Sequence, residues 1–314
     1  MKRLSETDHE QIRLRQDTAA IRAQLANRML HLLGDNDDLV TMIPGLKLTR
    51  RTRVLPPRSF LYEPSLAMMV CGSKHVMLGD TSYTYDESQL LLTAIDVPTI
   101  TVLPGASPET PHLSVLLKLD LATARQMIAT IQRQDPVAIP VAAGMATGSA
   151  TVAMFDGVRR LLDLLDTPQA IPILSGLIHR ELLYRLLTSP VGAQLRQTVT
   201  LGTQSNRVTQ AISWLKDNYA SPLRIQELAR LSGMGVSTLH RHFRAMTAMS
   251  PLEFQKHLRL HEARRLMLNE QMDTASASLR VGYESATQFN REYRRLFGEP
   301  PLRDIRALRM GGLD

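Results

Sequence analysis

The spacing of hydrophobic residues divides the chain into three parts. Residues 5–33 carry apolar side chains at helical spacing among charged ones, and the polar segment 34–38 ends this pattern. From about residue 40 to residue 120 the pattern changes to short apolar runs between turn residues, which is typical of β-strands. After Asp120 the spacing is helical again over most of the remaining chain.

The central part predicts a β-meander. Glycine supplies the positive φ that two-residue hairpin turns require at Gly72-Ser73 and Gly79-Asp80. About eight short strands with no helix between them predict an antiparallel β-barrel of the cupin or jelly-roll type, so the fold class is α+β. The predicted strands are Leu46–Arg53, Ser65–Cys71, Lys74–Leu78, Thr81–Tyr85, Gln89–Thr93, Thr99–Val102 and Leu113–Leu119.

Helices are predicted after the strands, over Leu121–Gln132, Thr151–Leu165 and Ala170–Leu187. The small residues of Ile139–Ser149 predict a linker between the first two of them. From these patterns we expect a helical extension at residues 1–39 and a barrel domain with helices at 40–190. A linker is expected at 191–204, followed by a separate all-α domain at 205–308.

The all-α domain contains one turn pattern twice. Two helices that cross over a short turn need a small residue at the crossing, a glycine in the turn and an apolar residue from the second helix. Ala229, Gly233 and Leu239 occur at the spacing of such a helix-turn-helix. Gly282 and Phe289 repeat the pattern with a turn one residue longer, so the sequence predicts two helix-turn-helix units.

A helix predicted over Leu252–Leu268 joins the two units. Its length of about 26 Å, with the helix packing at both ends, approaches the roughly 34 Å of one turn of B-DNA. The second helices of both units are therefore expected to enter successive major grooves of double-stranded DNA. One chain would then bind an asymmetric DNA site.

Charge supports this hypothesis. The chain has 314 residues and a formal net charge of +7. Residues 205–314 hold 17 Lys and Arg against 11 Asp and Glu, whereas residues 1–204 hold 20 against 19. A basic third on a nearly neutral body is typical of a domain that binds a polyanion.

Other features exclude several classes of protein. No apolar run approaches the roughly 18 residues that cross a bilayer, and the charged start lacks the apolar stretch of a secretory signal. Cys71 is the only cysteine, which excludes an intrachain disulfide. We expect a cytoplasmic protein with no membrane contact.

The outward faces of the two second helices carry the candidate DNA contacts. Arg241 and Arg291 suit a guanine edge, and Asn290 suits adenine. Arg244, Arg294 and Arg295 lie further along the helices and are expected to hold phosphates. The alternative is that these side chains only form solvated helix faces. The candidate contacts are Ser237, Thr238, His240, Arg241, Arg244, Thr287, Asn290, Arg291, Arg294 and Arg295.

Residues 205–306 resemble the AraC/XylS family of bacterial transcription regulators. The resemblance is carried by SPLRIQELARLSGMGVSTLHRHFRAMTAMSPLEFQKHLRLHEARRLML and VGYESATQFNREYRRLFGEPP. The family's DNA-contacting positions correspond to Ser237, His240, Arg241, Thr287, Asn290 and Arg291. The sequence departs from the family pattern at Gly235, where a serine usually caps the helix, at Ser278 and at Asp304, a usual tyrosine position.

The stretch from LYEPSLAMMVCGSKHVMLGD to ASPETPHLSVLLKLDL resembles the cupin-like domain of one AraC subgroup. That resemblance implies that the N-terminal domain senses a small-molecule effector or forms a homodimer. The proteins of this family regulate transcription, so contact with RNA polymerase is also implied. Effector binding would change how the two domains pack and which DNA half-sites are occupied.

The barrel leaves several alternatives open. Tyr62, Cys71, Tyr83, Tyr85 and His112 are candidate ligand-binding residues, but each is also compatible with an ordinary strand or buried position. His75 and His112 are isolated and no His-x-His pair lies in the barrel, so no metal, no cofactor and no catalysis are expected. The helices at 151–187 either form a dimer interface or cover the barrel. The alternative class is a cupin-type enzyme or small-molecule-binding protein whose helical domain binds other proteins.

Overall fold

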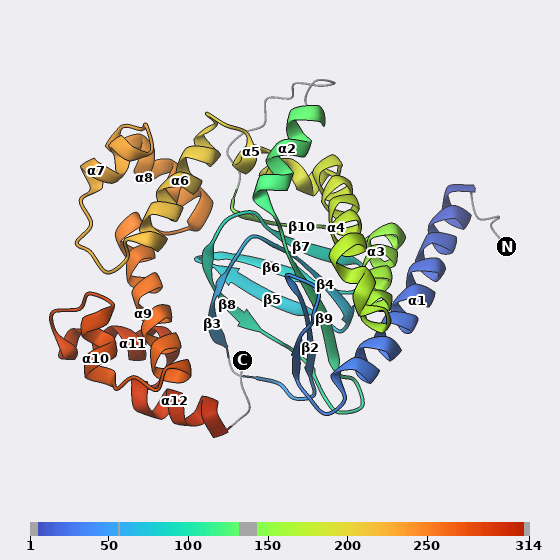
Figure 1. Cartoon of the computed structure of the whole chain (residues 1–314), viewed down its shortest axis with the longest axis horizontal. Coiled ribbons are helices and arrows are strands. Elements are labelled where there is room, and N and C mark those ends of the chain that lie inside the picture. The colour runs from blue at the N-terminus through green and yellow to red at the C-terminus, as the bar shows by residue number, and fades with distance from the viewer. Residues whose placement is uncertain (1–5, 56, 132–142, 311–314) are drawn as a thin grey trace.

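The computed structural model describes residues 6–55, 57–131 and 143–310. Its N-terminal part consists of two antiparallel sheets with helices on one side, and its C-terminal part is helical throughout (Figure 1). The strands are β1 (Asp38–Val40), β2 (Leu46–Arg51), β3 (Arg58–Tyr62), β4 (Ser65–Cys71), β5 (Lys74–Leu78), β6 (Thr81–Tyr85), β7 (Gln89–Thr93), β8 (Val97–Val102), β9 (His112–Lys118) and β10 (Met145–Ser149).

The strands form an open two-sheet sandwich. The larger sheet has the order β1-β2-β9-β4-β7-β10 and the smaller one β3-β8-β5-β6. Within the described residues no strand pairing joins the two sheets, so the antiparallel jelly-roll-like architecture is confirmed but a closed barrel is wrong. The edge strand β3 contacts the C-terminal helices α9 and α11.

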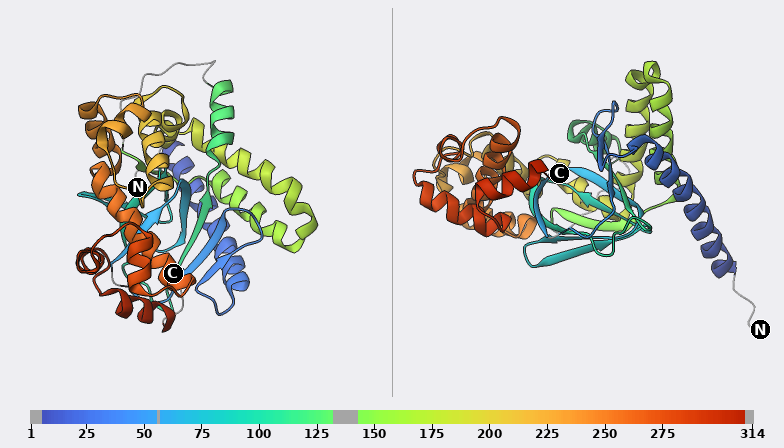
Figure 2. Two further views of the ribbon diagram at one scale, coloured as in Figure 1. Left: turned by 60° about the vertical axis from the view of Figure 1, so that its left-hand side comes forward. Right: turned by 90° about the horizontal axis from the view of Figure 1, so that it is seen from below.

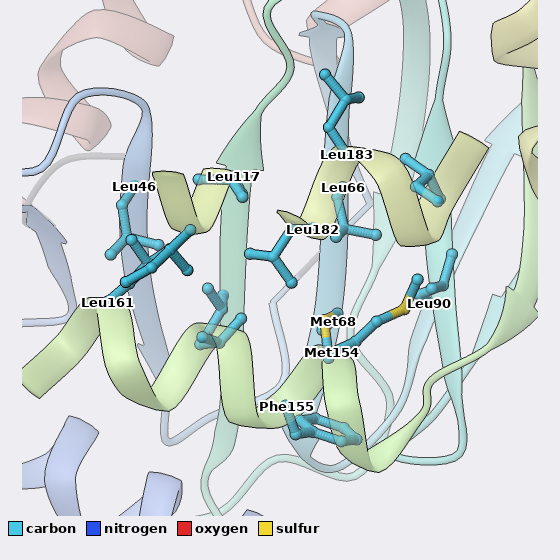
Figure 3. Close-up of a cluster of buried hydrophobic side chains, with 14 of the residues drawn as sticks. Leu46, Leu66, Met68, Leu90, Leu117, Met154, Phe155, Leu161, Leu182 and Leu183 are labelled. Atoms are coloured by element: carbon cyan, nitrogen blue, oxygen red, sulfur yellow. The ribbon is translucent and has the colours of Figure 1, made fainter. Parts of the chain in front are cut away.

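Helices cover the outer face of the larger sheet. These are α1 (Glu6–Leu33), α3 (Val152–Asp163) and α4 (Ile171–Thr188). Alternate residues of β4 divide between the two faces: Leu66 and Met68 lie under the helices, whereas Met69 faces the other sheet. In Figure 3 the side chains from α3 and α4 lie directly over those of the sheet; the labelled residues are Leu46, Leu66, Met68, Leu90, Leu117, Met154, Phe155, Leu161, Leu182 and Leu183.

The segment after β9 differs from the sequence prediction. Helix α2 (Leu121–Ile131) forms as predicted, and Gln132 lies outside the described residues. Of the predicted linker Ile139–Ser149, residues 139–142 also lie outside them, but Met145–Ser149 is strand β10, paired with β7. The linker prediction is wrong there because pairing with a buried leucine-rich strand makes a strand from residues of low intrinsic β-propensity.

The predicted connector 191–204 is largely helical. A turn of 3₁₀ helix (Pro190–Gly192) leads into α5 (Ala193–Val199), in which Leu195 and Val199 are buried in the sandwich-side core. Of the predicted extension 1–39, residues 1–5 lie outside the described part. Among the described residues no single helix is long and apolar enough to cross a membrane, and one pair bent by 120°, Val152–Asp166 with Pro168–Thr188, passes on length and composition alone.

The C-terminal helices lie on the side of the sandwich opposite α1 (Figure 2). They are α6 (Gln204–Asp217), α7 (Ile225–Leu231), α8 (Val236–Thr247), α9 (Pro251–Asn269), α10 (Thr274–Arg280), α11 (Ala286–Phe297) and α12 (Pro301–Met310). The hydrophobic cluster between the two sheets continues into α6, α8 and the start of α9. A third cluster is formed by the second half of α9 with α10, α11 and α12.

Polar contacts join the C-terminal helices to the two sheets at several places. The Gly144 amide, next to β10, donates a hydrogen bond to the Met246 carbonyl of α8 at 2.9 Å. Lys216 of α6 forms an ion pair with Asp96 at 2.6 Å, and Ser59 Oγ lies 3.2 Å from Nε2 of His261 on α9. The sandwich is therefore in contact with α6, with α8 and with the middle of α9.

Candidate nucleic-acid interface

The first helix-turn-helix unit consists of α7 and α8. Gly233 adopts a φ of 63° in the turn, and the Met234 amide donates to the Ala229 carbonyl at 2.9 Å. Leu239 is fully buried between the helices, and Arg207 of α6 donates to the Gly233 carbonyl at 2.7 Å. The roles predicted for Ala229, Gly233 and Leu239 are confirmed.

The second unit consists of α10 and α11. Gly282 adopts a φ of 89°, and a Cβ atom there would lie 2.1 Å from the Ala220 carbonyl oxygen, so only glycine fits. Phe289 and Tyr293 are fully buried. Helix α11 begins at residue 286 and α8 at residue 236, and each has 12 residues, so the second helices of the two units repeat with an offset of 50 positions.

Helix α9 joins the two units. Its 19 residues span about 28 Å. Ser250 and Glu253 form a capping box at its start, and near its end Arg264 makes a buried bidentate ion pair with Asp304 of α12 at 2.9 and 3.1 Å. The Tyr293 hydroxyl also donates to Asp304, at 2.7 Å. The departure from the family pattern at Asp304 is thus matched by a charged partner on α9, and the pair fixes α11 through Tyr293.

The outward faces agree with the sequence prediction. Leu239, Phe243, Phe289 and Tyr293 are buried, as expected. Thr238 is half-buried, and every other predicted contact is exposed: Ser237, His240, Arg241, Arg244, Thr287, Asn290, Arg291, Arg294 and Arg295. The two sets lie on α8 and α11, at opposite ends of α9 (Figure 1).

The outward face of α11 carries arginines whose charge is not neutralised by the acid on the same helix. Helix α11 presents Arg291, Arg294 and Arg295 to solvent, and its acidic residue Glu292 lies on another side, where it accepts hydrogen bonds from Tyr283 at 2.8 Å and Lys256 at 3.3 Å. Burial raises the pKa of the Tyr283 hydroxyl, which keeps it a proton donor. The acid therefore does not neutralise the arginine face.

One part of this surface does not follow from the helix-turn-helix pattern. Arg303 and Arg306 of α12 are exposed and line a groove with Arg294, next to a second groove lined by Asn290, Arg291 and Arg295. With an offset of 50 positions they align with Glu253 and Lys256 of the first unit. Comparing the two units at these positions in the sequence would have identified the additional arginines.

The tyrosines predicted as ligand-binding residues lie between the two sheets. Tyr85 is fully buried there, and its hydroxyl has no hydrogen-bond partner among the described residues. Tyr62 and Tyr83 pack against the same cluster, and Tyr62 Oη lies 2.9 Å from Thr101 Oγ1. Lys74 Nζ lies 5.9 Å from the Tyr62 ring centroid. The smaller sheet therefore carries tyrosine hydroxyl groups and the Lys74 ammonium group at the space between the two sheets.

His112 and Cys71 lie on the larger sheet, on different faces. His112 alternates along β9 with Leu113 and Val115, which lie under the helices, so it points toward the other sheet. Cys71 packs against the cluster beneath the helices and is not part of the tyrosine group. Burial and Glu87 raise the pKa of its thiol, which opposes thiolate formation.

Comparison with known proteins agrees with this architecture. Residues 42–194 match the family model described as the AraC-type transcriptional regulator N-terminus, and residues 228–307 match a helix-turn-helix domain model. The transcriptional activator RhaS of Escherichia coli (strain SE11) is 27% identical over 157 residues, which cover 50% of this chain and 55% of RhaS. RhaS of Escherichia fergusonii is 29% identical over 159 residues, with the same coverage. The chain thus matches about half the length of these relatives.

Solved structures share the two-part fold. ToxT from Vibrio cholerae superimposes with a TM-score of 0.57 at 9% identity, covering 83% of this chain and 97% of ToxT. ToxT bound to (E)-4-(8-methylnaphthalen-1-yl)but-3-enoic acid gives a TM-score of 0.56 at 11% identity, covering 84% of this chain and 98% of that one. None of these matches supports the enzyme alternative. From the two family models and the RhaS relatives, the chain belongs to the AraC family of transcriptional regulators.

Proposed function

We propose that this protein binds a specific site in duplex DNA and regulates transcription from it. The observation that carries the proposal is the pair of exposed, arginine-bearing helices α8 and α11 at the two ends of α9. The length of α9 suits two adjacent major grooves on one side of a duplex. In this proposal residues 205–308 form the DNA-binding domain, and residues 40–190 form a sensory or dimerisation domain.

Each candidate contact has a proposed role. Arg241, Asn290 and Arg291 read base edges, because guanidinium and amide groups form paired hydrogen bonds to guanine and adenine. Ser237, Thr238, His240 and Thr287 flank them on the same helices. Arg244, Arg294 and Arg295 hold phosphates, since they lie one turn further along.

The test selects binding sites from a random pool of duplex DNA with the full chain and then measures variants on the selected site. Arg241→Ala or Arg291→Ala is expected to weaken binding to the selected site by about 1–3 kcal/mol and to relax the base preference at one position. Arg244→Ala or Arg294→Ala is expected to weaken binding to all sequences and to lower the salt dependence by about one unit of slope.

The outcomes separate the roles. If Arg241→Ala weakens the selected site and random DNA equally, Arg241 is a phosphate contact and not a base reader. If selection enriches no sequence, the proposal of a specific DNA site is wrong. Arg159→Ala, which removes a half-exposed arginine from α3 on the sandwich side, is the control and leaves DNA affinity unchanged.

We also propose that the sandwich interior senses a small molecule. Support comes from the unpartnered Tyr85 hydroxyl and the Lys74 ammonium group near Tyr62. Apolar carboxylic acids of the kind present in the ToxT complex are suitable probes, because the interior combines apolar side chains with a cation. Binding of such an acid is expected to raise the melting temperature of the wild type, and Lys74→Met is expected to abolish the shift. An equal shift in Lys74→Met would contradict this site.

The proposed homodimer uses α4. This helix exposes four large apolar side chains, which are Ile173, Leu174, Leu177 and Tyr184. The exposed fraction is 72% for Ile173 and 61% for Leu177. Ile173, Leu177 and Tyr184 lie on one side of the helix and form an apolar stripe. A second copy of the chain would cover this stripe. Leu177→Glu is expected to convert a dimer to a monomer in sedimentation equilibrium. A monomeric wild type, or a dimeric Leu177→Glu variant, would rule out this interface.

The remaining proposals concern the regulatory output. The RhaS relatives are named activators, and on this basis we propose that the chain activates transcription through contact with RNA polymerase in the bacterial cytoplasm. Transcription with purified bacterial RNA polymerase on a template carrying the selected site tests this. More transcript in the presence of the protein supports activation, and less transcript indicates repression.

A further inference from the structure

Helix α12 extends the basic surface of the second helix-turn-helix unit. A groove next to α11 is lined by three arginines and one acid among six residues: Arg294, Glu299, Pro300, Leu302, Arg303 and Arg306. It adjoins the groove that contains Arg291 and Arg295, and both grooves share Arg294 and Pro300. The arginines of α12 are therefore continuous with the proposed DNA-binding face of α11.

Arg303 and Arg306 are available for a ligand. They are three residues apart on one helix, so they lie on the same side of it. Asp304, the nearest acid in sequence, is buried and bonded to Arg264 and Tyr293. Glu299 lies 3.4 Å from Arg303, but both side chains are largely exposed, and such a pair contributes little. Among the described residues no carboxylate lies within ion-pair distance of Arg306.

The first unit has no such pair at the corresponding positions. With the offset of 50, Arg303 corresponds to Glu253 and Arg306 corresponds to Lys256. Glu253 is held in the capping box with Ser250, and Lys256 is paired with Glu292 of α11 at 3.3 Å. The first unit thus presents an acid and a partnered lysine where the second presents two arginines.

We propose that Arg303 and Arg306 bind consecutive phosphates of the DNA backbone beside α11, and that the first unit lacks this contact. The inference rests on the proposed DNA binding and adds a partner for α12. Guanidinium groups form paired hydrogen bonds with phosphate oxygens, which suits two arginines on one helix face. The second unit therefore contributes more of the sequence-independent affinity than the first.

The experiment uses the full chain and a mixed-sequence duplex of about three helical turns, at salt concentrations from about 50 to about 200 mM. Fluorescence anisotropy gives the dependence of affinity on salt. Arg306→Ala is expected to weaken binding about five-fold at the lowest salt and to reduce the slope by about one unit. The double variant Arg303→Ala/Arg306→Ala is expected to reduce it by about two units.

Lys256→Ala is the matched control at the equivalent position of the first unit, and its slope is expected to equal that of the wild type. Circular dichroism melting confirms that each variant is folded. If the wild type binds with a salt-dependent affinity and Arg306→Ala keeps its slope, the inference about α12 is wrong and the proposed function stands. If Lys256→Ala loses as much slope as Arg306→Ala, the asymmetry is wrong. A wild type that does not bind duplex DNA would overturn the proposed function itself.

Discussion

The second helices of the two helix-turn-helix units have the same length and bury residues at two equivalent positions, Leu239 and Phe243 in α8 and Phe289 and Tyr293 in α11, but the protein holds the units differently. The first unit packs against the sandwich, and the C-terminal end of α8 accepts a hydrogen bond from Gly144 at 2.9 Å. The second unit is fixed mainly from within, by a buried ion pair between α9 and α12. Asp304 supplies the negative charge of this pair. The equivalent position of the first unit holds Phe254, which is fully buried.

The residues that follow α8 and α11 also differ between the two units. Each helix ends in a residue with positive φ, which is Ala248 at 58° in the first unit and Gly298 at 86° in the second. Alanine is disfavoured there by about 1 kcal/mol. At Ala248 the side chain lies against Gly79 in the β5–β6 turn, where a Cβ atom on Gly79 would lie 2.5 Å from that of Ala248. A contact with the sandwich thus accompanies the strained alanine in the first unit, whereas the second unit has glycine at the equivalent position.

The largest effect is expected from the ionic core of the second unit. Asp304→Ala leaves the buried Arg264 guanidinium without its acid and the Tyr293 hydroxyl without its acceptor, so we expect a loss of about 3–5 kcal/mol in the free energy of unfolding. Urea denaturation measures it. The exposed pair of Arg303 with Glu299 is the control, and Arg303→Ala is expected to cost less than about 1 kcal/mol. Equal losses in the two variants would show that the buried pair does not hold this unit.

The contact between the first unit and the β5–β6 turn is the next test. Gly79→Ala places a methyl group at positive φ and against Ala248, and we expect a loss of about 2–3 kcal/mol. Gly34→Ala is the matched control, because Gly34 has a φ of 53° and open space around its Cβ position; it should lose only about 1 kcal/mol. In the Ala248→Gly background the loss from Gly79→Ala should shrink to the value of the control. If it does not, the two residues do not couple the domains.

His261 lies on α9 where this helix contacts β3, and it is expected to make the stability of the protein depend on pH. Burial, with His257 and Arg264, lowers the pKa of His261 to about 3. The folded protein keeps His261 neutral while the unfolded chain becomes protonated below about pH 6.5, so unfolding takes up a proton and stability falls as the pH decreases. At pH 5 the expected loss relative to pH 7 is about 2 kcal/mol from this residue.

His261→Gln removes the titration and keeps a group that can bond to Ser59, which lies 3.2 Å from Nε2 of His261. Urea denaturation between pH 5 and pH 7 is expected to show a flatter profile for this variant by about the same 2 kcal/mol. The exposed His240 on α8 provides the control, and His240→Gln should keep the profile of the wild type. A profile unchanged by His261→Gln would mean that the buried histidine is not what destabilises the protein in acid.

The sequence predicts the C-terminal domain better than the sandwich because the relevant signals there are local. Ala229, Gly233 and Leu239 are within about ten positions of one another, and helical spacing alone separates the buried Phe289 from the exposed Arg291. The outward face of each second helix therefore follows from the spacing of residues along the chain.

The missed elements depend on distant residues. Strands β1, β3 and β10 are short edge strands, and β10 forms because its residues pair with β7 more than 50 positions earlier. The contact of Ala248 with Gly79 joins residues that are still farther apart in the chain. The position of Cys71 beneath the helices also does not follow from simple strand alternation, because a register shift in β4 between Met69 and Cys71 changes that alternation.

The smallest expected effect concerns the starts of the two second helices. Ser285 caps α11, with its hydroxyl 3.3 Å from the Gln288 amide, whereas the equivalent residue of α8 is Gly235, which has no side chain to cap that helix. Gly235 has an extended backbone with a φ of −72°, and its Cβ position is open, so a serine fits there without strain. Gly235→Ser is expected to stabilise the protein by a few tenths of a kcal/mol, and Ser285→Gly to destabilise it by about the same amount. Paired urea denaturation of the two variants measures both changes. Opposite signs of similar size would show that the units differ at this position only in their caps, whereas a loss of stability in Gly235→Ser would indicate that the start of α8 requires glycine for another reason.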